Sequence, residues 1–106
     1  MSPVADQLIA YNAQDVEAFV ACYTEDVLIE DATGSLISKG REAMRTNYAR
    51  MFAAHPHNHA QILHTISVGD YVVEHERITG RGPEPIFAVA IYRITGDLIS
   101  HVRFLK

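Results

Sequence analysis

The spacing of the apolar residues changes in the middle of the chain, and this change limits the possible folds more than any other feature. Before His55-Pro56 the apolar residues recur at helical spacing, and after it they form separate runs with strand character. The runs cover residues 59–68, 71–79, 86–95 and 98–105. Gly69-Asp70 and Gly96-Asp97 are short hairpin signals, so neighbouring strands are expected to be antiparallel. Helices followed by such a meander predict an α+β fold with the helices on one face of a curved sheet.

The first half of the chain predicts two short helices and one longer helix. Ser2-Pro3 is a start signal, because a proline at the first helical position loses no needed donor. Asp15 is a candidate N-cap for the second helix, and the third is expected over residues 41–54. Its apolar stripe consists of Met44, Tyr48, Met51 and Phe52. Between these helices, residues 27–30 predict a short strand and residues 34–40 a loop or short hairpin.

Length and charge restrict the class of protein. With 106 residues the chain fits a single domain over residues 1–106. Its formal net charge of -4 argues against nucleic acid or an anionic membrane as a partner. The single cysteine, Cys22, excludes an internal disulfide. The chain shows neither a signal peptide pattern nor an apolar run of membrane-spanning length, so we expect a cytoplasmic protein.

Four short segments carry a resemblance to a known family. They are Asn12-Ala13-Gln14-Asp15, Tyr23-Thr24-Glu25-Asp26, Ile29-Glu30-Asp31 and Lys39-Gly40-Arg41-Glu42. This pattern resembles the NTF2-like superfamily, within it the SnoaL-like and ketosteroid-isomerase-like branch. The resemblance implies a cone in which a curved, mixed sheet wraps a long helix and encloses an apolar pocket. It also implies a homodimer formed through the outer face of the sheet. The superfamily includes isomerases, cyclases and non-catalytic binding modules, so the fold alone decides no function.

The resemblance assigns roles to individual positions. Asp31 falls on the position of the isomerase general base, and Tyr23 and Tyr48 match tyrosines of the isomerase pocket. Gln7 stands in place of the tyrosine that donates to the oxyanion, and Ala90 in place of the protonated carboxylic acid that also donates there. Without these two donors the main electrostatic stabilisation of a dienolate is missing. Ordinary steroid isomerase activity is therefore not expected.

Two strands near the end of the chain add polar candidates. His101 and Arg103 share one face of their strand. The resemblance places this face inside the cone, where both would serve catalysis, while the opposite register would place them at the dimer interface. In the charged segment 74–77, the resemblance favours Glu74 and Glu76 as the inward residues, with Glu74 contributing to ligand binding.

Each of the remaining candidates also has a plainer role. Asp31 is either a catalytic base or a carboxylate that caps the following turn. Phe52 belongs to the helical stripe, which is core and in a cone also lines the pocket. The histidine-rich segment 55–59 lacks the spacing of a metal motif, so we predict neither a metal site nor a cofactor.

These observations together predict a small, cofactor-independent protein that binds an apolar carbonyl compound. Asp31 would act as the base of an isomerase-type or polyketide-cyclase-type proton transfer, with His101 and Arg103 as polar helpers. The alternative is a module that binds a small hydrophobic ligand, or that serves dimerisation, without catalysis.

Overall fold

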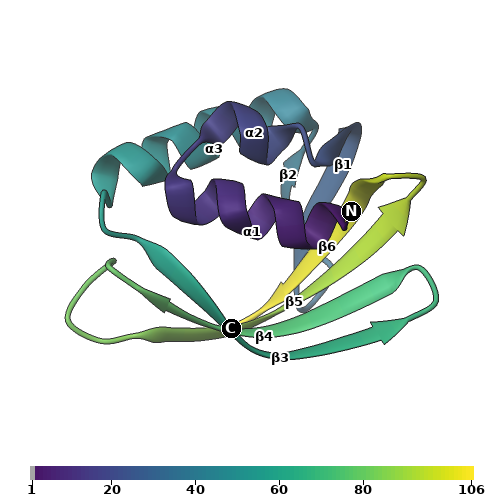
Figure 1. The fold of residues 1–106 in the computed structure, drawn as a ribbon. Coiled ribbons are helices and arrows are strands. Elements are labelled where there is room, and N and C mark those ends of the chain that lie inside the picture. Colours follow the sequence, from purple (N-terminus) through teal and green to yellow (C-terminus); the bar gives the residue numbers. More distant parts are fainter. Residues whose placement is uncertain (1) are drawn as a thin grey trace.

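The computed structural model describes residues 2–106 and shows three helices lying on one face of a single curved sheet (Figure 1). The helices are α1 (Pro3–Ala13), α2 (Val16–Val20) and α3 (Arg41–Ala54). The strands are β1 (Tyr23–Asp31), β2 (Leu36–Lys39), β3 (His59–Val68), β4 (Tyr71–Thr79), β5 (Ile86–Thr95) and β6 (Leu98–Leu105). This arrangement confirms the predicted α+β class.

The sheet has the order β2-β1-β6-β5-β4-β3 and is mixed. β1 and β6 pair in parallel, and every other neighbouring pair is antiparallel. The parallel pair joins the short β1–β2 hairpin to the meander of β3 to β6. The sheet then curves beneath the helices, as the predicted cone requires (Figure 1).

Helix signals in the sequence match the helix boundaries. The Ser2 side chain accepts a hydrogen bond from the amide of Ala5, and Asp15 accepts one from Ala18, so both act as the predicted N-caps. β1 begins at Tyr23 rather than at Val27, and of the two alternatives for residues 34–40 the hairpin is present. The longer β1 was missed because its first half carries polar residues.

Strand alternation divides the sheet into a covered and an open face. On the face toward the helices, the central strands present buried side chains such as Ile29, Tyr92 and Val102. Phe19 and Met44 pack on them from the helical side. The opposite, convex face retains exposed apolar residues such as Ile66 and Phe87.

No helix within residues 2–106 is long and apolar enough to cross a membrane.

Candidate active site

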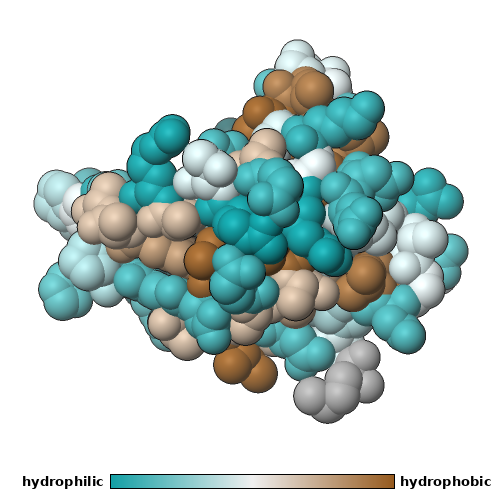
Figure 2. All heavy atoms as spheres, turned by 90° about the horizontal axis from the view of Figure 1, so that it is seen from above, coloured by the Kyte–Doolittle hydropathy of each residue, from teal (hydrophilic) through white to brown (hydrophobic). Residues whose placement is uncertain are grey.

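A cavity of about 230 Å³ lies between the helices and the concave face of the sheet. Six aromatic residues contribute to its wall: Tyr11, Phe19, Tyr23, Tyr48, Tyr92 and Phe104. They come from α1, α2, α3 and three strands of the sheet, so the complete fold is needed to assemble the wall. Seen from the helical side, the surface above is mostly hydrophilic, with hydrophobic residues visible between the polar ones (Figure 2).

Glu76 is the acidic residue of this wall. It lies on β4, and only 7% of its surface is exposed. Burial raises the pKa of its carboxyl to about 7, and the negative charge of nearby Glu74 adds to this effect. Lys106 and Arg81 oppose the shift in pKa without cancelling it. At neutral pH Glu76 is therefore divided between its acid and its base form, which suits a group that moves protons.

Three buried tyrosines line the same cavity as this carboxyl. Burial is the main cause that raises the pKa of Tyr23, Tyr48 and Tyr92, so all three phenols stay protonated at neutral pH. The negative charge of Glu76, which lines the same cavity, is a further cause of the raised pKa in each case. The cavity thus combines one proton acceptor with several neutral hydrogen-bond donors.

Gln7 orders two of these tyrosines. The Tyr23 hydroxyl donates to Gln7 Oε1 at 3.1 Å. Gln7 Nε2 in turn donates to the Tyr92 hydroxyl at 3.4 Å and to the Val4 carbonyl at 3.0 Å. Because the Tyr92 oxygen accepts from Gln7, its own hydrogen is free to point at a ligand. Gln7 thus lines the cavity and is bonded there to the Tyr92 hydroxyl.

Arg81 fixes a further tyrosine at the cavity wall. Its Nη2 donates to the Tyr11 hydroxyl at 2.7 Å, and its Nε donates to Asn58 Oδ1 at 2.7 Å. A charged donor polarises the phenol that accepts from it, so Tyr11 becomes a better donor toward the cavity. Arg81 follows β4 in a loop, where strand periodicity gave no reason to select it.

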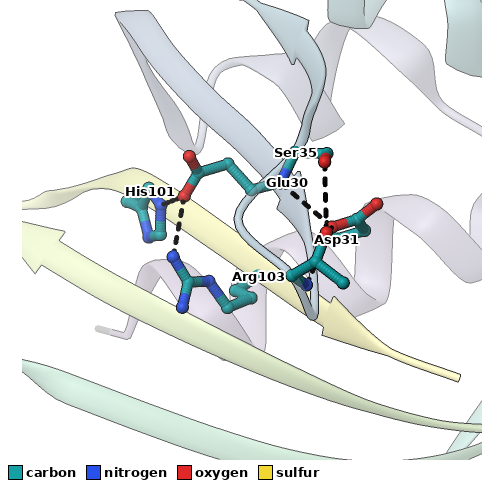
Figure 3. A network of polar contacts seen from close by, with 6 residues as sticks. Glu30, Asp31, Ser35, His101 and Arg103 are labelled. Atoms are coloured by element: carbon teal, nitrogen blue, oxygen red, sulfur yellow. Dashed lines mark hydrogen bonds and ion pairs between the residues drawn. The ribbon is translucent and has the colours of Figure 1, made fainter.

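Asp31 does not contribute to the cavity wall. Its Oδ1 accepts from the Thr33 hydroxyl at 2.6 Å, the Thr33 amide at 2.9 Å and the Ser35 amide at 3.0 Å (Figure 3). These bonds, led by the one from the Thr33 hydroxyl, lower the pKa of Asp31. The carboxylate therefore caps the turn between β1 and β2, which is the plainer of its two predicted roles.

The predicted inward position of His101 and Arg103 is wrong. On β6 the inward residues are Val102, which is 1% exposed, and Phe104, which lines the cavity. His101 and Arg103 therefore point to the convex face, because successive side chains of a strand alternate. There His101 Nε2 lies 2.5 Å from Glu30 Oε1, and Arg103 Nη2 lies 3.3 Å from the same oxygen (Figure 3). The register inferred from the resemblance was off by one residue.

The other predicted positions divide between cavity and core. Tyr23 and Tyr48 line the cavity. Phe52 and Ala90 are buried in the hydrophobic core and do not contribute to the cavity wall. Glu74 points inward as predicted, but it lies behind the wall, where its Oε2 accepts from the Thr65 hydroxyl at 3.4 Å. Within residues 2–106 no group of three or more potential metal ligands occurs, and the segment 55–59 forms the connection from α3 into β3.

The turn role of Asp31 leads to a pH-dependent prediction. A lowered pKa in the folded state stabilises the fold above the unfolded pKa, about 3.9 for Asp, and this contribution is lost as pH falls through the folded pKa. Asp31→Asn should therefore lower the thermal midpoint at pH 7, and the difference from wild type should shrink toward pH 2. Calorimetry across this range measures it. If the difference in thermal midpoint between wild type and Asp31→Asn stayed constant down to pH 2, the loss of stability would come from the asparagine side chain itself. That result would contradict a role for the charge of Asp31.

Sequence reasoning did not select Glu76, Tyr92 or Arg81 as residues of the cavity wall. A signal for Tyr92 was present, because it lies two residues beyond inward-facing Ala90 on the same strand. Glu76 was predicted to face inward, but periodicity does not show which of two neighbouring carboxylates reaches a cavity.

Comparison with known proteins places this arrangement in a family. The model of the SnoaL-like domain matches residues 4–102. A cystatin-fold protein from Novosphingobium aromaticivorans is 35% identical, with 100% of this chain and 99% of that chain covered and a TM-score of 0.92. A comparison with curated proteins finds no match.

Two more distant structures share the fold. One is a proposed polyketide cyclase from Sinorhizobium meliloti, which is 20% identical over 96% of this chain and 92% of that chain, with a TM-score of 0.84. The other, from Catenulispora acidiphila, has a ketosteroid isomerase-like fold and was solved with trimethylamine. It is 22% identical over 96% of this chain and 82% of that chain, with a TM-score of 0.79. The family model and the 35% identical structure together show that this chain belongs to the SnoaL-like family, within the NTF2-like fold.

Proposed function

We propose that the protein is a cofactor-independent enzyme that moves a proton at a carbon next to a carbonyl group of an apolar compound. Glu76, rather than Asp31, is the base. One observation carries this proposal: a carboxyl with a pKa of about 7 lies in a cavity whose wall includes several neutral phenols. The SnoaL-like family and the ketosteroid isomerase-like fold of a more distant relative agree with such chemistry.

The cavity contains the groups that the reaction requires. The ionised Glu76 takes the proton from the carbon, and the electron pair of the broken C–H bond moves onto the carbonyl oxygen. The hydroxyls of Tyr92 and Tyr11 each accept a hydrogen bond from the protein, so their own hydrogens can stabilise the resulting enolate. Return of the proton from Glu76 to the same carbon gives exchange, and its return to a conjugated carbon gives isomerisation.

The size of the cavity limits the compound. Its volume of about 230 Å³ lies below the range of roughly 300–1,000 Å³ that is usual for ligand pockets. The apolar part of the wall suits a ring or a short chain, so a compound with one or two rings fits better than a four-ring steroid.

Deuterium uptake tests the proposal without a guess about the product. Wild-type protein is incubated in heavy water with small enolisable ketones and enones, and uptake is followed by mass spectrometry. Because Glu76 must be ionised to act as base, uptake should rise with pH and level off above about pH 7. If no ketone takes up deuterium faster than in buffer, the proposal fails and the non-catalytic binding module becomes the better description.

We also propose that two copies associate through the convex face of the sheet. The support is a set of exposed apolar residues on that face: Ile66, Val68, Tyr71, Phe87 and Leu105. Such a set is larger than isolated surface residues would give. Sedimentation should show a dimer for wild type and a monomer for Phe87→Glu, with the same circular dichroism spectrum. A wild-type monomer at 100 μM, roughly the weak end of specific protein association, would contradict this proposal.

A further inference from the structure

We infer that the compound bound in the cavity carries a carboxylate in addition to its carbonyl group, and that Arg81 and Lys106 bind this carboxylate. The inference rests on the proposed function, since it names the substrate class of the same cavity. It starts from the two cationic side chains in the wall.

Arg81 is held in place with part of its guanidinium unused. Asn58 takes the Nε hydrogen and the Tyr11 hydroxyl takes a hydrogen of Nη2, both at 2.7 Å. These bonds fix the plane of the guanidinium at the wall before any ligand arrives. They leave the hydrogens of Nη1 for a carboxylate, the acceptor that best matches a guanidinium.

Lys106 lies on the other side of Glu76 in the sheet. Glu76 of β4 pairs with Ala88 of β5. The next residue of β5, Val89, pairs with Leu105 of β6, so Lys106 lies opposite Ala88 on its other side. Glu76, Ala88 and Lys106 therefore form one row across the sheet. Its Nζ lies 5.8 Å from the centre of the Phe104 ring, and both residues line the cavity. Arg81, in the loop after β4, and Lys106, directly after β6, therefore lie on two separate segments of the chain, and both lower the pKa of Glu76.

The charges in the wall do not balance. Within residues 2–106 the ion pairs link Arg45 to Glu17 and Glu42, and Glu30 to His101 and Arg103. Arg81 and Lys106 take part in none of these pairs, and Glu76 is the acidic side chain that shares the wall with them. Since Glu76 is only partly ionised near pH 7, the wall has an excess of positive charge in a chain of net charge -4. A ligand carboxylate would neutralise this excess.

A matched pair of ketones tests the inference. The probes are 3-oxocyclohexane-1-carboxylate and its methyl ester, which share the ring and the enolisable carbons but differ in charge. Deuterium uptake is measured for wild type and Lys106→Gln. Lys39→Gln serves as the control, because Lys39 is the other lysine of the chain, is exposed and does not line the cavity.

We expect kcat/KM for the acid to exceed that for the ester by about tenfold in wild type and in Lys39→Gln, the effect of one favourable charge contact. Lys106→Gln should remove most of this preference, so that acid and ester exchange at nearly equal rates in this variant. The ratio of the two rates is the readout, because Lys106 also lowers the pKa of Glu76 and its loss alters the base for both probes alike. Equal rates for acid and ester, or faster exchange of the ester, would overturn the inference and leave the proposed function standing.

A binding measurement separates this inference from the proposed function. Cyclohexanecarboxylate has no ketone, so its affinity, followed by NMR titration, reports the carboxylate site alone. Binding that Lys106→Gln weakens about tenfold supports the inference even where neither ketone exchanges. Absence of binding at millimolar concentration, or binding that Lys106→Gln leaves unchanged, overturns it.

Discussion

Replacing Glu76 by glutamine should slow deuterium uptake by about 100- to 10,000-fold, the range that a positioned base contributes. Glutamine keeps the size of the side chain and removes only its ability to take a proton. Asp31→Asn is the matched control, because Asp31 is also a carboxylate on a strand but caps a turn outside the cavity wall. It should change uptake by less than about threefold. The opposite result, with uptake lost in Asp31→Asn and kept in Glu76→Gln, would return the base to Asp31.

The same variant should be more stable than wild type, which excludes misfolding as the cause of lost activity. A carboxyl whose folded pKa is raised destabilises the fold as pH rises above its unfolded pKa, and the full cost is reached above its folded pKa of about 7. Glutamine removes this cost, so the free energy of unfolding should rise by about 3 kcal/mol at pH 8 and change little at pH 4. Urea unfolding at both pH values measures it. A variant that is less stable at pH 8 would show that Glu76 is not buried as an ionisable group.

Gly80→Ala should destabilise the fold by about 3 kcal/mol or more, because two separate costs coincide. Gly80 has a φ of +91°, which residues with a side chain rarely adopt. A Cβ there would also lie 2.1 Å from the carbonyl oxygen of His57, a backbone atom that cannot move alone. Relief of this clash would displace Asn58, the residue that holds Arg81 at the cavity wall. Loss of stability and loss of uptake should therefore occur together.

Two other glycines separate these costs. Gly69 has a φ of +56° with open space around it, so Gly69→Ala tests the backbone cost alone and should lose about 1 kcal/mol. Gly82 lies in open space without a positive φ, so Gly82→Ala should be neutral or slightly stabilising. Urea unfolding of the three variants gives the order. A Gly80→Ala variant no less stable than Gly69→Ala would contradict the close approach to His57.

The fold could be predicted from the sequence because each of its elements depends on local signals. The N-caps Ser2 and Asp15 mark two helices, and the hairpin signals Gly69-Asp70 and Gly96-Asp97 mark the turns of the meander. Parallel pairing of β1 with β6 has no local signal, since it joins segments far apart in the chain. The curved, mixed sheet was therefore predicted from the resemblance to the NTF2-like superfamily and not from local signals.

The site was harder to predict because it depends on register and on loops. β6 pairs with β5 through an irregularity near Arg93 and Ile94, and β1 pairs with β6 through another. Such irregularities shift the register, and the inward face that the resemblance assigned to β6 was off by one residue. The resemblance indicated a general base only at the position that the base has in the isomerases, and Asp31 stands at that position. In the structure the acidic residue of the cavity wall is Glu76 on β4, so a position shared with a family need not lie in the cavity.

The parallel contact between β1 and β6 also affects how the chain reaches its fold during synthesis. β1 leaves the ribosome early, yet until β6 follows its only sheet neighbour is the short β2. During that interval Val27 and Ile29 lack the neighbouring strand that completes their side of the sheet, and such unfinished pairing invites association with other chains. Nascent protein released before β6 should therefore be prone to aggregation, and the sheet should close late and slowly, because its decisive contact is also among its most distant in sequence.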